Sequence, residues 1–175
     1  MRAEALPVRA LTKAAFAPYG EVVEIAGAER RLINQGSTER FHALANVDVA
    51  DGGGRPIVSI FRGQPFAPPI EIVMMERHPL GSQMFYPLSD LSFLVIVAPD
   101  RAGTPGMPEV FICSAGTGVN YAKNVWHHPL VSLGAESDFL IVDREGPGDN
   151  LEEHTYSGIR YRIDAIAGAE AESEA

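Results

Sequence analysis

The first group of side chains that could do chemistry lies in an apolar segment, residues 75–87, which reads "MERHPLGSQMFYP". Glu76 and His78 are two positions apart, so on a strand their side chains point to the same face. Gln83 follows after the turn "HPLG" and can be directed to that side. Carboxylate and imidazole groups transfer protons and bind divalent cations. This segment therefore predicts an acid–base site, a metal site, or both.

The second group lies in residues 120–130, "NYAKNVWHHPL", which contains the single tryptophan of the chain. On an extended strand Lys123 and His127 share one face, whereas Trp126 and His128 share the other. The two adjacent histidines therefore cannot both point into one pocket unless a bulge intervenes. Pro129 makes His128 extended and places it at the expected end of the strand.

Short strands must position these two groups, because the rest of the chain reads as strands and turns. We expect eight to ten strands, among them the alternating run "IVSIFRGQP" and the buried run "LSFLVIVAPD". The only helix predicted is a short one from Lys13 to Phe16, with Thr12 as its N-cap. The prediction is an all-β jelly roll or small barrel in one domain, residues 1–165. We expect the small acidic end, residues 166–175, to be disordered.

The composition restricts the possible partners. The chain has 175 residues and a formal net charge of −9, which disfavours binding to nucleic acid and to anionic membranes. An anionic substrate would need a local cluster of arginine or lysine. The single cysteine, Cys113, allows neither a disulfide framework nor a thiolate metal cluster within one chain. No signal peptide or membrane span is evident, and "DGGG" lacks the features of a phosphate loop, so we expect a cytoplasmic protein without an organic cofactor.

The two segments resemble the two sequence motifs of the cupin superfamily. "ERHPLGSQMFYP" matches the first motif, with Glu76 in place of its first histidine and Gln83 in place of its acid. "AKNVWH" matches the second motif and aligns His127 with the histidine of that motif. The resemblance implies a cupin-like double-stranded β-helix. It also implies a possible metal set of Glu76, His78, Gln83 and His127, which is weaker than three histidines and a glutamate because an amide oxygen is a poor ligand.

A resemblance that covers residues 5–150 is to the ureidoglycolate lyase family. It is carried by "AFAPYGEV", "INQGSTERFH", "ERHPLGSQMFYPL", "GVNYAKNVWHHPL" and "DFLIVDR", in that order. This resemblance implies a carbon–nitrogen lyase of allantoin degradation and purine catabolism that releases urea and glyoxylate from (S)-ureidoglycolate. It further implies a homodimer and a divalent metal such as nickel, which the substituted ligand set leaves open.

That reaction suggests a role for each candidate residue. His127 is our candidate acid or base, with Glu76 or His78 as the second proton carrier or as a metal ligand. The substrate carboxylate needs a cation, for which an arginine fork is well suited. The candidate substrate-binding residues are Arg40, Arg62 and Lys123 for the carboxylate, Asn34 and Gln83 for the ureido group, and Trp126 as a wall.

Two other functions remain open from the sequence. The same fold could carry a metal-dependent cupin oxidoreductase or isomerase, which would require a firmly held metal. It could also be a non-catalytic module that binds a small acid, which glyoxylate would stabilise without any turnover of ureidoglycolate.

Overall fold

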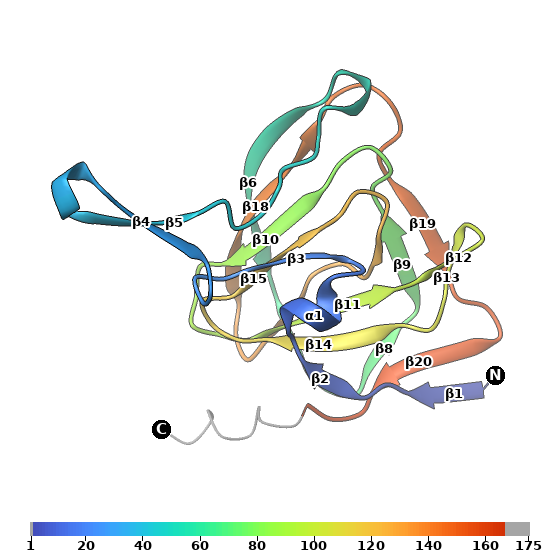
Figure 1. Cartoon of the computed structure of the whole chain (residues 1–175). Helices are drawn as coiled ribbons and strands as arrows, with labels where there is room; N and C mark the ends of the chain where they lie inside the picture. The colour runs from blue at the N-terminus through green and yellow to red at the C-terminus, as the bar shows by residue number, and fades with distance from the viewer. Residues whose placement is uncertain (1, 167–175) are drawn as a thin grey trace.

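The computed structural model describes residues 2–166, and this part of the chain is built almost entirely of β-strands (Figure 1). Its one α-helix is α1 (Lys13–Phe16). The Thr12 side chain accepts a hydrogen bond from the Ala15 backbone N–H at 3.1 Å, as an N-cap residue does. The predicted helix and its cap are therefore confirmed. None of the described helices is long and apolar enough to cross a membrane.

Three sheets make up the body of the molecule. The first contains, in spatial order, β3 (Gly20–Val23), β15 (Gly118–Tyr121), β10 (Gln83–Pro87), β18 (Ser137–Glu145) and β6 (Arg55–Gly63). The second contains β19 (Glu152–Thr155), β9 (Met74–Arg77), β16 (Trp126–His127), β11 (Phe93–Ala98), β14 (Glu109–Cys113) and β2 (Val8–Ala10), with β17 (Val131–Leu133) and β7 (Pro65–Phe66) attached beside β11. The third contains β1 (Arg2–Ala5), β20 (Ile159–Ile163) and β8 (Ile70–Ile72).

The remaining elements are two hairpins and two short 3₁₀ turns. They are β4 (Glu29–Ile33) with β5 (Thr38–His42), β12 (Asp100–Arg101) with β13 (Thr104–Pro105), and the turns η1 (Asn34–Gly36) and η2 (Asp51–Gly53). The β4–β5 hairpin with η1, residues 29–42, projects from the barrel, and we call it the arm (Figure 1).

The strand β11 explains how the sheets stack. Val95 and Val97 belong to a cluster shared with the first sheet, which includes Phe139 and Ile141 of β18. The alternate residues of β11 belong to a second cluster with the third sheet: they are Leu94, Ile96 and Ala98, packed with Ile70, Ile72 and Ile163. All six residues of β11 are buried. The strand is covered on both faces, which is why its sequence is an unbroken apolar run.

The predicted fold class is confirmed: the protein is all-β with a short N-terminal helix, and two sheets enclose a core. The described residues contain twenty strands, more than the eight to ten predicted, because some predicted strands are divided into short pieces and other strands, such as β19, were not predicted. Ile166 is buried in the core, and residues 167–175 of the expected acidic tail lie outside the described residues.

Candidate active site

The structure brings Glu76, His78 and His127 together. Strands β9 and β16 are antiparallel neighbours in which His127 pairs directly with Glu76, and His78 follows the end of β9. The Nε2 atom of His127 lies 3.5 Å from the nearer Glu76 oxygen, and the Nε2 atom of His78 lies 4.0 Å from it. Two segments about fifty positions apart in the sequence therefore converge at one place.

Backbone carbonyls fix the state of both imidazole rings. His127 Nδ1 lies 3.0 Å from the Val125 carbonyl oxygen, and His78 Nδ1 lies 2.7 Å from the Asn150 carbonyl oxygen. A carbonyl oxygen only accepts hydrogen bonds, so each ring donates through Nδ1–H, and the lone pair of the neutral ring is on Nε2. Both Nε2 atoms are buried without a hydrogen-bond partner. Each ring thus presents a free basic nitrogen toward Glu76.

Charge and burial set the protonation of this cluster. Burial raises the pKa of Glu76, but the nearby imidazoles of His127 and His78 outweigh it, so the pKa of this carboxyl is lowered overall. Burial, together with the charge of His127, lowers the pKa of His78 despite the opposing effects of the Asn150 carbonyl and Glu76. At neutral pH the cluster therefore combines an ionised carboxylate with a neutral His78.

Gln83 and Asp143 extend the cluster on the side of the first sheet. Gln83 Nε2 donates a hydrogen bond to Asp143 Oδ2 at 3.3 Å. The other oxygen of each side chain, Gln83 Oε1 and Asp143 Oδ1, is buried and has no partner. Buried polar atoms normally have hydrogen-bond partners, so these unpaired oxygens indicate a place for a ligand.

The donor set fits a divalent cation. Ligand atoms of Glu76, His78 and His127 all lie within 4.8 Å of one another, which is close to the spacing of about 3–4 Å that a single ion imposes on its ligands. The unpartnered Gln83 Oε1 offers a fourth, weaker donor. Nitrogen and oxygen donors of this kind suit a first-row transition metal.

A hollow of about 580 Å³ lies beside this cluster, with Glu76 and Gln83 in its lining. Its rim is apolar and carries Ile60, Phe61 and Phe66. This size and this lining, apolar with a few polar groups, are typical of a site for a small molecule. The Tyr121 ring stacks on His127 with centroids 4.3 Å apart, which holds the imidazole plane in place.

Two of the predicted cationic residues are already paired. Arg62 lines the hollow, but its guanidinium forms a two-pronged ion pair with Asp138 at 2.8 and 2.9 Å. Lys123 Nζ binds Asp51 at 2.6 Å and Asp48 at 3.2 Å, and Lys123 is not in the lining of the hollow. The hydrogen bonds from Lys123 to these aspartates raise its pKa, so it remains a cation that its own neighbours neutralise.

The other three predicted binding residues lie elsewhere in this chain. Trp126 faces the opposite side of β16 from His127, where its Nε1 donates to Asp100 at 2.9 Å and Arg77 covers its ring. It therefore packs in the core instead of forming a wall of the hollow. Asn34 and Arg40 are exposed on the arm, away from the cluster.

Sequence reasoning missed three residues that shape the site. One is Asp143, which was not among the predicted site residues; its neighbour Arg144 binds the backbone carbonyls of Asp51 and Pro147. The alternation in "SDFLIVDRE" could have placed Asp143 on the inner face with Ile141. Nothing in the sequence marks the stacking of Tyr121 or the contact of Asn150, because both depend on the register between distant segments.

Two of the solved structures with partial similarity to this chain are isomerases. A 3,4-ketoisomerase from Helicobacter canadensis has a TM-score of 0.44 and 11% identity, covering 75% of this chain and 88% of that one. A dTDP sugar isomerase from Desulfovibrio desulfuricans G20 has a TM-score of 0.42 and 16% identity, covering 74% and 82%.

Curated relatives are more similar in sequence. Ureidoglycolate lyase from Brucella anthropi is 57% identical over 169 residues, which is 97% of this chain and the full length of the relative. Ureidoglycolate lyase from Rhizobium etli is 58% identical over 150 residues, covering 86% of this chain and 90% of the relative. The family model described as ureidoglycolate lyase matches residues 3–163. With that match spanning all three sheets and the histidine cluster, the chain belongs to the ureidoglycolate lyase family.

Proposed function

We propose that this chain is a carbon–nitrogen lyase that cleaves (S)-ureidoglycolate into glyoxylate and urea. The observation that carries the proposal is the convergence of Glu76, His78 and His127 beside the hollow, with both Nε2 atoms buried and unpartnered, in a member of this family. The name of the family also supports a place in allantoin degradation, within purine catabolism.

Ureidoglycolate carries a hydroxyl group and the urea nitrogen on one carbon, next to a carboxylate. In the reaction the hydroxyl proton leaves, its O–H electrons form the carbonyl of glyoxylate, and the C–N electrons pass to the nitrogen, which gains a proton. The Glu76 carboxylate and His127 Nε2, 3.5 Å apart, form a pair that can take the hydroxyl proton and return it to the departing nitrogen. We assign His127 as the acid–base residue, with Glu76 or His78 as the second proton carrier.

The substrate carboxylate and ureido group need their own contacts. Arg62 is the cationic residue in the lining of the hollow, and it would share its guanidinium between Asp138 and the substrate. Gln83 Oε1 is free to accept a hydrogen bond from the ureido N–H groups. Lys123 could contribute only by leaving Asp51 and Asp48, and Trp126 only by supporting the strand that carries His127.

A divalent metal, nickel or a similar ion, is the proposed cofactor, held by Glu76, His78 and His127 with Gln83 as a weaker donor. Such an ion would act as a Lewis acid toward the substrate oxygens. A His127 that binds the metal through Nε2 could not also carry a proton on that atom. Loss of activity on metal removal would therefore favour the role of metal ligand, and retained activity would favour the role of acid–base residue.

Three broader proposals complete the assignment. We propose that residues 1–165 form one catalytic domain, which is supported by the core clusters that join strands from β2 near the start of the chain to β20 near its end. We infer a homodimer in solution, supported by the family resemblance and by the exposed arm. We also infer a cytoplasmic protein, which the metabolic reaction proposed above supports.

The test is an assay of urea and glyoxylate release from racemic ureidoglycolate, with and without a chelator. We expect equimolar urea and glyoxylate, at most half of the racemate consumed, and loss of activity on chelation that nickel or another divalent ion restores. Retained activity in a sample shown to be metal-free would support the lyase function and overturn the proposed metal cofactor. Absence of both products in metal-loaded protein would overturn the proposed function, and stabilisation by glyoxylate alone would then favour a binding module.

A further inference from the structure

The arm is a two-stranded ribbon without support from its own barrel. Every residue of β4 is exposed, and so are the first three of β5. The apolar side chains Leu32 and Ile33 are 61% and 37% exposed. Figure 1 shows the arm extending outward from the barrel. Because an isolated two-stranded ribbon is only marginally stable in water, a ribbon this exposed is expected to rest on another surface.

One face of the arm presents paired arginines. Strand register places Arg31 directly opposite Arg40, so their side chains share a face. Arg31 donates to Glu29 at 2.7 Å, but Arg40 has no hydrogen bond or ion pair with any described residue. Like charges directly opposite one another destabilise a sheet, and a bound anion reverses that effect. This face therefore suits a carboxylate.

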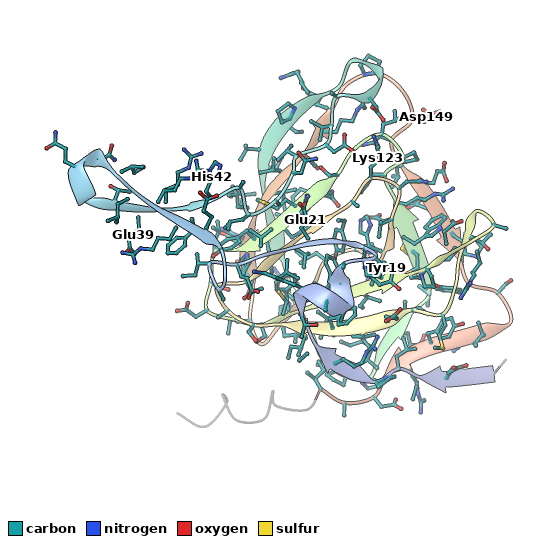
Figure 2. The ribbon with its side chains drawn as sticks, in the orientation of Figure 1. Tyr19, Glu21, Glu39, His42, Lys123 and Asp149 are labelled. Atoms are coloured by element: carbon teal, nitrogen blue, oxygen red, sulfur yellow. The ribbon has the colours of Figure 1, made fainter. Side chains whose placement is uncertain are left out.

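The opposite face of the arm differs in charge balance. Arg30 forms an ion pair with Glu39 there, so its cation is neutralised within the arm. Figure 2 shows Glu39 and His42 on opposite sides of the ribbon, as the strand alternation requires. Only one of the two faces thus carries an uncompensated cation.

The tip of the arm has an unusual backbone. Asn34 and Gln35 both adopt the left-handed region, with φ of 53° and 58°. Gln35, with φ 58° and ψ 31°, and Gly36, with φ 87°, form a type I′ turn that the hydrogen bond from Ser37 N–H to the Asn34 carbonyl closes. Such turns match the twist of two paired strands, so the tip keeps the arm a well-formed hairpin out to its end.

The described residues that line the hollow include no unpaired cation, whereas the arm carries one in Arg40. Glu76 and Gln83 form its polar end, and its one lining cation, Arg62, is held by Asp138. A substrate carboxylate beside an ionised Glu76 needs an additional positive charge. The rim is correspondingly apolar and open, since Ile60 and Phe66 are 54% and 44% exposed.

The strand β6 carries part of this rim, through Ile60, and also forms an exposed edge of the first sheet. It is the edge strand of the first sheet, and Val58 on it is 69% exposed. A long, exposed, apolar edge strand is normally covered in a native assembly. An arm lying along β6 would cover Val58 and Ile60 and would bring its own apolar residues out of water.

We propose that the arm of one copy lies across β6 of a second copy and places Arg40 at the mouth of its hollow, where the guanidinium binds the substrate carboxylate. This inference rests on the proposed lyase function. The occupant is a second copy because the unpaired cation and the cation-poor hollow occur on the same chain, while the arm points away from its own barrel (Figure 1). A two-fold dimer makes the contact twice, so each active site contains residues of both subunits.

The test is complementation between two inactive subunits. His127→Ala and Arg40→Ala chains are co-expressed with different tags, and the heterodimer is isolated through both tags. If the arm acts on its partner, one site in the heterodimer has both defects and the other has none. We expect about half of the wild-type kcat/KM per dimer. Arg40→Ala homodimers should lose about 10- to 100-fold in kcat/KM, mainly through KM.

The matched control is Arg30→Ala, which removes an arginine from the other face of the arm and should leave kcat/KM unchanged. A heterodimer no more active than the two parent homodimers, when the wild-type dimer is active, would overturn the role of the arm in its partner. Full activity of Arg40→Ala homodimers would overturn the role of Arg40. Wild-type dimers that release no urea would overturn the proposed function together with the role of the arm in it.

Discussion

Among single residues, the two hydrogen bonds to the Val125 and Asn150 carbonyls determine what the histidines can do. They orient the rings of His127 and His78 so that Nε2 of each faces Glu76. Backbone carbonyls are fixed by the strands and loops that contain them, so the cluster is organised before any ligand binds. Such preorganisation reduces the reorganisation that substrate or metal binding would otherwise require.

Replacing His127 with alanine tests its assignment. We expect His127→Ala to lower kcat for urea release by about 100-fold or more, because positioned acid–base groups contribute on that order. His154→Ala is the matched control, since His154 lies on β19 and packs edge-on against Trp126, away from the hollow. Steady-state kinetics and a thermal melt of each variant give the measurement. Activity of His127→Ala within about twofold of wild type would remove its assigned role.

The sequence was most informative where spacing alone places a side chain. The two-residue separation placed Glu76 and His78 on one face, and the resemblance to the second cupin motif identified His127 as the residue that meets them. Alternation also separates Trp126 from His127, and the core position of the tryptophan agrees with that. The positions of Asn34 and Arg40 could not be predicted, because local sequence shows that a hairpin forms but not where the hairpin points.

At the level of elements, β11 is the strand on which the stacking of sheets depends. Its side chains alternate between two separate hydrophobic clusters, and it also pairs with β16, which carries His127. A substitution that changes the packing of β11 is therefore expected to affect both the hydrophobic core and the position of His127. The unbroken apolar run that reveals this strand in the sequence is a direct result of its burial on both faces.

A matched pair of valine substitutions tests the central place of β11. Val95 is fully buried and Val73 is 49% exposed. We expect Val95→Ala to lower the free energy of unfolding by about 2 kcal/mol, through lost burial and the cavity that remains. Val73→Ala should change it by less than about 0.5 kcal/mol. Urea denaturation of the two variants measures the difference, and equal midpoints would contradict the assignment.

The strands that sequence reasoning missed are those without a strong apolar pattern. β19 reads "EEHT", and all four of its residues are exposed or only partly buried. It is a strand because it pairs with β9, from Arg77–Glu152 to Met74–Thr155, which is a tertiary contact and not a local propensity. The short strands β16 and β17, which pair with β11, were not resolved as separate strands in the prediction for the same reason.

For the whole molecule, the arm is the feature that the barrel does not require. Glu29 and His42 are register partners at its base, so residues 30–41 can be replaced by Asn-Gly to close a short hairpin. We expect the shortened chain to melt near the wild-type temperature, because the excised residues are nearly all exposed. We also expect it to be monomeric and to lose most of its kcat/KM.

Light scattering after gel filtration gives the mass, and the urea assay gives the activity. The matched control is the Arg30→Ala chain, which keeps the arm and should remain a dimer. A shortened chain that is still dimeric would show that the copies associate through another surface.

The environment of Trp126 gives the protein a built-in optical signal. The only indole of the chain is 2% exposed, hydrogen-bonded to Asp100, covered by the Arg77 guanidinium and adjacent in sequence to His127. Its fluorescence should therefore be blue-shifted in the native state and should respond when an ion or a small acid binds on the other face of its two-residue strand. Ligand titrations can then be followed without a label, in the same sample that is used for kinetics.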